Sequence, residues 1–282
     1  MSLGLRYKNN DLVLEEREVN GVPFLSYPLL DGTGCVLHGF STRLGGVSEG
    51  HCKTMNISTK RGDKPEAVEE NRRRIAAAIG VEPDRMVYTQ QTHTTNVVVV
   101  HAGDEGRTFE ETDGMITNVP GICLVTFYAD CVPLYFVDPV KKVIGLSHSG
   151  WRGTVGKMAK VTVERMTEEY GTRPEDIVAA IGPSICQDCY EVSEDVIAQF
   201  QENYDKKYWD KLYYAKGNGK YQLNLWKANE INFLESGILK EHIAVTNVCT
   251  CCNPDILFSH RVLGWERGNL SAFLALKENK RS

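Results

Sequence analysis

The sequence lacks a long apolar run, a basic block and an export signal, and each absence excludes a class of protein. No stretch approaches the ~20 apolar residues of a membrane-spanning helix. The N-terminus has no positively charged head leading into an apolar signal core. The net charge of −5 is spread along the chain, so the electrostatic footprint of a nucleic-acid or membrane binder is missing. We therefore expect a cytoplasmic protein that acts on small molecules and binds neither nucleic acid nor membranes.

The sequence also has no internal repeat, no low-complexity tract and no linker rich in proline or serine. A chain of 282 residues with 42% hydrophobic residues can bury a substantial core. We therefore expect a single domain over residues 1–282, either as a monomer or as a homodimer. The cysteine count of nine is odd, which favours reduced thiols and metal ligands over a disulfide framework.

Helical patterns are few, and strand patterns dominate the first half. One helix is predicted from an N-cap at Asp63, with Glu66 completing a capping box, to Gly80. Helical periodicity also covers residues 154–170, 193–204 and 224–236, with Ser193 and Asn224 as N-caps. Residues 86–148 contain only short β-branched or apolar runs. Strands in succession with helices grouped elsewhere predict an α+β fold with mixed or antiparallel sheets.

Three metal-ligand side chains stand at the ends of predicted strands: His93, Cys131 and His148. Taken alone, a histidine at such a position is more often hydrogen-bonded to the backbone than bound to a metal, and a cysteine is more often a small core residue. Together they match a catalytic zinc site, which takes three protein ligands and leaves the fourth position open. We expect Zn²⁺ there, with Cu²⁺ as the alternative. Asp130 adjoins Cys131 and is either a catalytic acid or a turn-capping residue.

Two glycine-containing segments carry candidate substrate-binding residues. Arg43, Gly45 and Gly46 offer a cation and backbone N–H groups to a phosphate or carboxylate, unless they form only a turn beside a surface arginine. Trp151 could stack on a flat ring and Arg152 could hold an anion. The alternative for Trp151 is packing in the core with no role in binding.

The remaining cysteines include Cys186-x-x-Cys189 and the segment "CTCC" at residues 249–252. Together they could form a second, structural zinc site. The interval between Cys189 and Cys249 is far longer than the spacing of a zinc ribbon, which counts against such a site.

Several motifs follow one another along the chain: "HGFSTRLGGVS", "QTH", "DGMITNVPGICLVTFYADCVPLYFVDP", "HSGWRGTV", "AAIGPSICQDCYEV" and "CTCCNPDILFSHR". Together they resemble the laccase-domain, multicopper polyphenol oxidase family, whose bacterial members are also called purine nucleoside phosphorylases or peptidoglycan editing factors. The resemblance implies a four-layer α/β/β/α sandwich and zinc ligands at His93, Cys131 and His148. It implies phosphorolysis of adenosine, inosine, guanosine and methylthioadenosine, together with adenosine deamination.

The resemblance also places Arg43 in a Thr-Arg-x-Gly-Gly motif at the pocket and keeps Asn56 as a substrate-binding residue. A family Thr-Gly-Arg is missing from "GWERGNLSAF", and His260 replaces a tyrosine. Zinc can lower the pKa of water to about 7, which would account for deamination. Phosphorolysis would use Arg43 and the glycine N–H groups to hold phosphate, and Asp130 as acid.

Three other functions remain open. A copper-dependent polyphenol oxidase would need a trinuclear cluster built from His-x-His pairs, and the seven histidines form none. A cysteine amidase acting on muropeptides would use Cys131 as nucleophile and a histidine as base. A purine-sensing module would bind without turnover.

Overall fold

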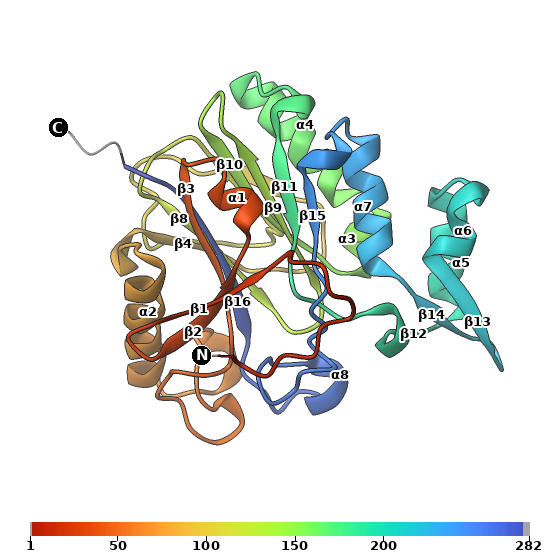
Figure 1. The fold of residues 1–282 in the computed structure, drawn as a ribbon. Helices are drawn as coiled ribbons and strands as arrows, with labels where there is room; N and C mark the ends of the chain where they lie inside the picture. Colours follow the sequence, from red (N-terminus) through yellow and green to blue (C-terminus); the bar gives the residue numbers. More distant parts are fainter. Residues whose placement is uncertain (1, 279–282) are drawn as a thin grey trace.

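A computed structural model describes residues 2–278, and its strands form two large sheets and one small one (Figure 1). The first sheet has the order β1 (Glu15–Val19), β2 (Val22–Ser26), β3 (Val36–Ser41), β16 (Leu270–Leu276), β8 (Cys123–Tyr128), β4 (Met86–Thr89) and β6 (Thr108–Phe109). The second has the order β15 (Ile243–Val245), β11 (Val178–Ile181), β9 (Val132–Asp138), β10 (Val143–Ser149), β7 (Gly114–Thr117) and β5 (Val97–Val99). The third contains β12 (Glu191–Ser193), β14 (Lys220–Leu223) and β13 (Tyr213–Gly217).

The two large sheets pack face to face around one apolar core and carry helices on their outer faces. Leu124 and Leu274 of the first sheet share this core with Tyr135 and Leu146 of the second. Helix α2 (Pro65–Ile79) covers the outer face of the first sheet, and α3 (Trp151–Val155), α4 (Met158–Tyr170) and α7 (Leu225–Glu235) cover that of the second (Figure 1). Both sheets contain parallel and antiparallel pairs. The four-layer α/β/β/α sandwich with mixed sheets is therefore confirmed.

The smaller elements lie at the margins of this sandwich. Helices α5 (Glu194–Asn203) and α6 (Trp209–Leu212) accompany the small sheet, which projects from one side in Figure 1. Helices α1 (Pro28–Asp31) and α8 (His260–Leu263) are single turns in connecting segments. Among the described residues, no helix is both long and apolar enough to cross a bilayer.

The helix boundaries show where local patterns predict the chain well and where they do not. Helix α7 is capped by Asn224, whose side chain accepts a hydrogen bond from the backbone N–H of Lys227 at 3.0 Å. Helix α5 begins after Ser193, as predicted. Gly80 closes α2 in the left-handed conformation, which glycine adopts without a steric penalty.

Two predicted boundaries were wrong. The N-cap of α2 is Lys64 and not Asp63, because both carboxylate oxygens of Asp63 are engaged elsewhere. They accept hydrogen bonds from Ser48, from Asn56 and from the Lys64 backbone N–H. The helix predicted over 154–170 is split into α3 and α4, because Lys157 adopts a positive φ of 59° between them.

Candidate active site

The three predicted metal ligands come together where β4, β9 and β10 end or begin. In the antiparallel pairing of β10 with β9, His148 lies opposite Pro133, so the end of β10 is beside Cys131, which immediately precedes β9. His93 follows β4 and projects from a tight turn with a φ of 65°. The donor atoms of His93, Cys131 and His148 all lie within 4.8 Å of one another, and His93 Nε2 is 3.9 Å from Cys131 Sγ. His148 is therefore the second-last residue of β10 and lies at the end of the strand where the three ligands meet.

Asp113, which precedes β7, holds both histidines in place. Its Oδ1 lies 2.8 Å from Nδ1 of His148, which leaves Nε2 of that ring to face Cys131 and His93. The same carboxylate accepts hydrogen bonds from the backbone N–H groups of Thr92, His93 and Thr94 and from the Thr94 hydroxyl, at 3.0–3.1 Å. A carboxylate bound to the far nitrogen of a ligating histidine is the usual outer partner of a metal site. The sequence analysis missed Asp113, although it begins the motif "DGMITNVPG".

The charges of the site favour ionised ligands. Burial opposes ionisation of Cys131, but the charge of His148 and hydrogen bonds with both histidines outweigh it and lower the pKa of the thiol to about 6. Burial likewise opposes protonation of His148, but the Cys131 thiolate and Asp113 outweigh it and raise its pKa to about 9. Burial would raise the pKa of Asp113, and its hydrogen bond with His148 lowers it instead. Cys131 is therefore held in the thiolate form that binds metals.

The donor set fits a zinc ion. Zn–N bonds of about 2.0–2.1 Å and Zn–S bonds of about 2.3 Å place tetrahedral N and S donors about 3.5 Å apart, close to the 3.9 Å separation of His93 Nε2 and Cys131 Sγ. Gly150 leaves room for this arrangement, because a Cβ there would lie 3.0 Å from the His93 ring and 3.2 Å from Cys131 Sγ. Residues 2–278 contain one other group of side chains able to hold a metal, which consists of four cysteines and no histidine. The described residues thus contain no histidine cluster of the kind that a trinuclear copper centre requires.

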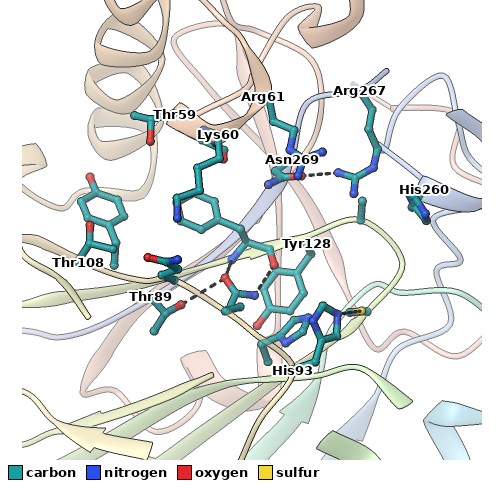
Figure 2. A pocket seen from close by; sticks show the side chains of 18 of the residues that line it. Thr59, Lys60, Arg61, Thr89, His93, Thr108, Tyr128, His260, Arg267 and Asn269 are labelled. Carbon is teal, nitrogen blue, oxygen red and sulfur yellow. Dashed lines mark hydrogen bonds between the residues drawn. The ribbon is translucent and has the colours of Figure 1, made fainter. Parts of the chain in front are cut away.

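A cavity of about 370 Å³ opens onto the three ligands (Figure 2). All three ligands line it, and its wall includes Tyr88 and Phe127, whose rings stack at 6.1 Å with an interplanar angle of 9°. Tyr128 adds an aromatic surface next to His148, with ring centroids 5.5 Å apart. This volume and apolar wall suit a small organic molecule.

The side of this cavity away from His93 is cationic. Arg61 and Arg267 lie there together, beside Asn269 (Figure 2). The Nε atoms of both arginines are buried without a hydrogen-bond partner among the described residues, as is Nε of Arg72. Burial and the neighbouring charge of Arg61 lower the pKa of Arg267 to about 10. Arg267 Nη1 donates hydrogen bonds to Asn269 Oδ1 and to the Gly268 carbonyl oxygen, but neither arginine forms an ion pair among the described residues, so the two positive charges suit an anion.

These cationic residues were missed by the sequence analysis. Arg61 belongs to the long loop after Arg43, at the end of a single 3₁₀ turn (Thr59–Arg61). Arg267 belongs to "GWERGNLSAF", the segment in which a family Thr-Gly-Arg is absent. Neither segment has a local phosphate-binding pattern, so only the fold brings the two arginines together.

Asp130, Trp151 and Arg152 line a second cavity of about 160 Å³, which shares His93, Cys131 and His260 with the first. Asp130 is buried with a φ of 82°, and its two oxygens accept hydrogen bonds from the Thr250 hydroxyl and the Arg261 backbone N–H, each at 2.6 Å. The guanidinium of Arg152 lies over the ring of Trp151. These three predicted residues are therefore next to the metal ligands.

The other predicted substrate-binding residues lie outside both cavities. Arg43 donates hydrogen bonds to the carbonyl oxygens of Lys53 and Pro254 and lies over Phe258. A Cβ on Gly46 would lie 2.2 Å from the Thr54 carbonyl oxygen, so this glycine permits a close approach between two backbone segments.

Gly45 and Asn56 belong to the same packed loop. Gly45 has a φ of 82°, and a Cβ there would lie 2.7 Å from the carbonyl oxygen of Gly21. Asn56 is buried, and its side-chain amide donates hydrogen bonds to Asp63 and to the Ser58 carbonyl oxygen. In this conformation, residues 43–56 support the loop that carries Arg61.

The chain is similar to curated proteins and to solved structures over most of its length. It is 35% identical to the protein named purine nucleoside phosphorylase YlmD of Bacillus subtilis (strain 168), over 86% of this chain and 89% of that protein. It is 33% identical to adenosine deaminase RL5 of an unknown prokaryotic organism, over 81% of this chain and 90% of that protein. The crystal structure of YlmD from Geobacillus stearothermophilus superposes with a TM-score of 0.88 at 32% identity, covering 94% of this chain and 99% of that one.

These likenesses agree with the motifs quoted above. Residues 37–277 match the family described as multi-copper polyphenol oxidoreductase laccase. That range includes the three ligands, Asp113 and both arginines of the cationic side. The chain belongs to the multi-copper polyphenol oxidoreductase laccase family.

Proposed function

We propose that this protein is a zinc-dependent purine nucleoside enzyme, a single domain that works in the cytoplasm, where thiols stay reduced. It cleaves adenosine, inosine, guanosine and methylthioadenosine with phosphate, and it also deaminates adenosine. The observation that carries the proposal is that one cavity joins the ligands His93, Cys131 and His148 to the pair Arg61 and Arg267 across an aromatic wall. The names of the relatives, a purine nucleoside phosphorylase and an adenosine deaminase, support the same substrate class.

The metal site provides for deamination. A zinc ion held by His93, Cys131 and His148 would supply a Lewis acid that lowers the pKa of water to about 7. The protein's own contribution is to hold three ligands on one side and to leave the side toward the cavity free for substrate. Asp113 fixes the His148 ring and the backbone of His93, so the ligands do not need to reorganise during reaction.

The cationic side provides for phosphorolysis. Arg61 and Arg267 line the cavity and can present their guanidinium groups to a phosphate, which then attacks C1′ of the ribose while the bond to the purine nitrogen breaks. The departing purine carries the electron pair of that bond and needs a proton or a hydrogen bond. Asp130 as the acid stays a prediction. His260 lines both cavities, and its Nδ1–H donates to the Gly264 carbonyl oxygen at 2.9 Å, so its Nε2 can donate to the departing purine only when the ring is doubly protonated.

The test compares the products formed from adenosine with and without phosphate. Adenine and ribose 1-phosphate should appear only with phosphate, and inosine should appear in both cases. The Arg61→Gln variant should raise the KM for phosphate about 10- to 100-fold, the value of one charged hydrogen bond, and leave deamination unchanged. Arg73→Gln, on the exposed face of α2, is the matched control. Equal loss of both reactions in Arg61→Gln would contradict the division of labour.

A second function, cysteine-type hydrolysis of an amide, is favoured by one observation. Asp113, His148 and Cys131 contact one another in the order acid, base and nucleophile. His93 is the argument for the metal, because a hydrolase of this kind does not need a second imidazole 3.9 Å from the sulfur. A trapped acyl-Cys131 after incubation with muropeptides would establish the hydrolase. Stoichiometric metal that protects Cys131 from alkylation would exclude it.

A further inference from the structure

Two Cys-x-x-Cys segments, far apart in the sequence, face each other beside the second sheet. The first runs from Cys186 to Cys189, and the second runs from Cys249 to Cys252. A parallel bridge joins Ser184 to Cys249, and the backbone N–H of Thr250 donates to the Ser184 carbonyl oxygen at 3.2 Å. The long interval between the segments, which counted against a joint site, is therefore bridged by the fold.

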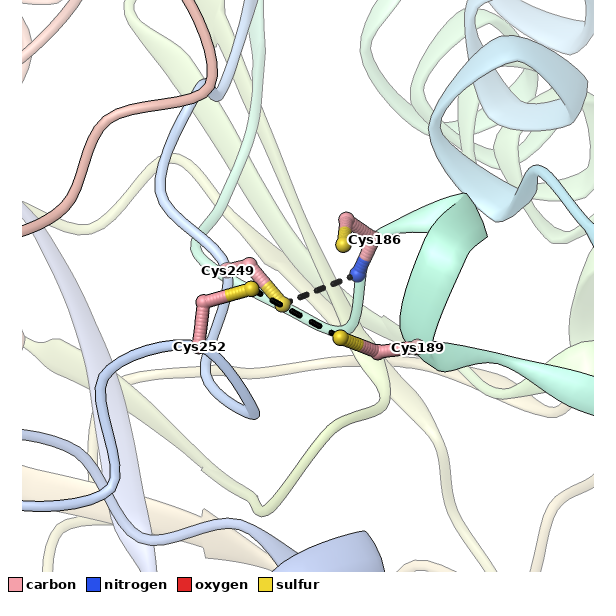
Figure 3. Close-up of side chains that lie close together, drawn as sticks. All are labelled: Cys186, Cys189, Cys249 and Cys252. Atoms are coloured by element: carbon pink, nitrogen blue, oxygen red, sulfur yellow. Dashed lines mark hydrogen bonds between the residues drawn. The ribbon is translucent and has the colours of Figure 1, made fainter.

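The four sulfur atoms form one cluster. The Sγ atoms of Cys186, Cys189, Cys249 and Cys252 all lie within 4.8 Å of one another (Figure 3). Cys189 Sγ and Cys252 Sγ are 3.6 Å apart, and all four cysteines are free. Four thiolates around one zinc ion, with Zn–S bonds of about 2.3 Å, are about 3.8 Å apart. The 3.6 Å separation is close to this value, and the 4.8 Å limit on the others places all four sulfur atoms within reach of one ion.

The surroundings of the cluster suit anionic sulfur. Cys186 and Cys249 are buried, and the backbone N–H of Cys186 points at Cys249 Sγ at a distance of 3.2 Å. N–H groups directed at ligand sulfur are a regular part of thiolate metal sites. Lys8 adds a positive charge over the first segment, where its Nζ pairs with Asp188 at 2.8 Å. Four neighbouring thiols cannot all ionise without a cation, because each thiolate disfavours the next.

We propose that Cys186, Cys189, Cys249 and Cys252 bind a structural zinc ion, distinct from the metal held at the cavity. Four soft thiolates with tetrahedral separations select zinc among the common divalent metals. The site is closed, since four protein ligands fill the coordination shell and leave no position for substrate. Cys251 does not belong to the four-sulfur group, although it lies in the same loop.

The zinc would tie together the backbone that supports the cavity. The Thr250 hydroxyl, next to Cys249, donates to one oxygen of Asp130 at 2.6 Å. The backbone N–H of Ile185, next to Cys186, donates to the carbonyl oxygen of Asp130 at 3.0 Å. Asp130 in turn precedes the ligand Cys131. The four-cysteine site thus lies one residue away from two of the contacts that hold Asp130.

The experiment counts metals in the full-length protein, purified under reducing conditions, by elemental mass spectrometry and native mass spectrometry. We expect two zinc ions per chain in the wild type and one in the double variant Cys189→Ser, Cys252→Ser. Cys251→Ser is the matched control and should keep two. One zinc per chain in the wild type, lost in Cys131→Ser and kept in the double variant, would overturn the proposal. Iron in the four-cysteine site would overturn the assignment of zinc.

A second measurement does not require the double variant to fold. The Cys131→Ser variant removes the only cysteine among the cavity's metal ligands, so any remaining thiolate coordination comes from the four-cysteine site. Loaded with Co²⁺, this variant should show the intense sulfur-to-cobalt charge-transfer bands of a tetrahedral thiolate complex. Their absence, or recovery of a Cys189–Cys252 disulfide by peptide mapping of the wild type, would contradict the proposal.

Discussion

The two groups of metal-binding side chains differ in how they are built. His93, Cys131 and His148 come from three strand ends, and their shared side opens onto a cavity of about 370 Å³. The four cysteines come from two loops, each of which contributes a Cys-x-x-Cys pair, and two of the four residues are buried. Four protein ligands leave no coordination position for a substrate. The first group therefore has the three ligands of a catalytic site with an open coordination position, and the second has the four ligands that fill the coordination shell of a structural site. Asp130 links them, because it directly precedes the ligand Cys131 and contacts Thr250 and Ile185, which adjoin two of the four cysteines.

The largest expected effect is on the open site. Cys131→Ser should abolish metal binding at the cavity and lower kcat/KM for adenosine by more than about 100-fold, because outer partners of a ligand alone are worth about 10- to 100-fold. Metal analysis and product assays check this, with Cys251→Ser as control. If Cys131→Ser keeps its turnover, the open site has no part in the reaction.

Removing an outer partner should have a smaller effect on the same site. In Asp113→Asn, we expect metal affinity at the cavity to fall about 10- to 100-fold, because the neutral amide holds His148 and the turn at His93 less firmly. Competition with a chelator measures the affinity. Asp138→Asn is the control, since Asp138 is also buried and accepts backbone hydrogen bonds at the other end of β9. Equal affinities in the two variants would show that Asp113 is only structural.

The closed site should respond in stability more than in chemistry. We expect Cys189→Ser, Cys252→Ser to lower Tm by about 5–15 °C, if the metal tether is worth the few kcal/mol of a comparable covalent cross-link. The kcat/KM should fall less than about 10-fold, because no cavity ligand is removed. Thermal unfolding monitored by circular dichroism gives the first value. A loss of activity as large as that of Cys131→Ser would erase the distinction between the two sites.

The smallest effect is expected at Gly150. The backbone of Gly150 has a φ of −68° and a ψ of −178°, which alanine also adopts, so Gly150→Ala acts only through the new methyl group. That methyl would press on His93 and Cys131 and should weaken metal binding by less than about 10-fold, with Tm unchanged within about 2 °C. Gly153→Ala is the control, since a Cβ there has its nearest contact at 3.5 Å. Tighter metal binding in Gly150→Ala would contradict this account.

The sequence could predict the open site because its ligands share a local signature. Each of the three follows or precedes an apolar run, and the ends of such runs lie where a layered fold meets solvent. The layered fold could be predicted because the strand patterns follow one another over residues 86–148 and the helical patterns are grouped elsewhere in the chain. Asp113 could not be recognised in this way, because its role depends on accepting backbone hydrogen bonds from the turn at residues 92–94.

The closed site and the cationic side of the cavity lacked such a signature. The two cysteine pairs come together where a parallel bridge joins Ser184 to Cys249. Arg61 and Arg267 line one cavity because β3 and β16, the strands next to their segments, pair in the first sheet. Conversely, the sequence around Arg43 suggested an anion site, because glycine turns occur both in anion-binding loops and where two backbone segments pack closely. The close approach of Gly46 to Thr54 shows that these glycines serve backbone packing, and that approach depends on the tertiary structure.

One carboxylate holds the imidazole of His148 and the backbone of His93, and this restricts how the metal preference of the open site can change. A substitution that moves Asp113 displaces both histidines together, so the two nitrogen donors cannot be tuned one at a time through that carboxylate. Cys131 follows Asp130, which is held by other contacts, so the sulfur ligand can be changed independently of the two histidines. Efforts to convert this centre to another metal should therefore begin at residue 131 and leave the carboxylate intact.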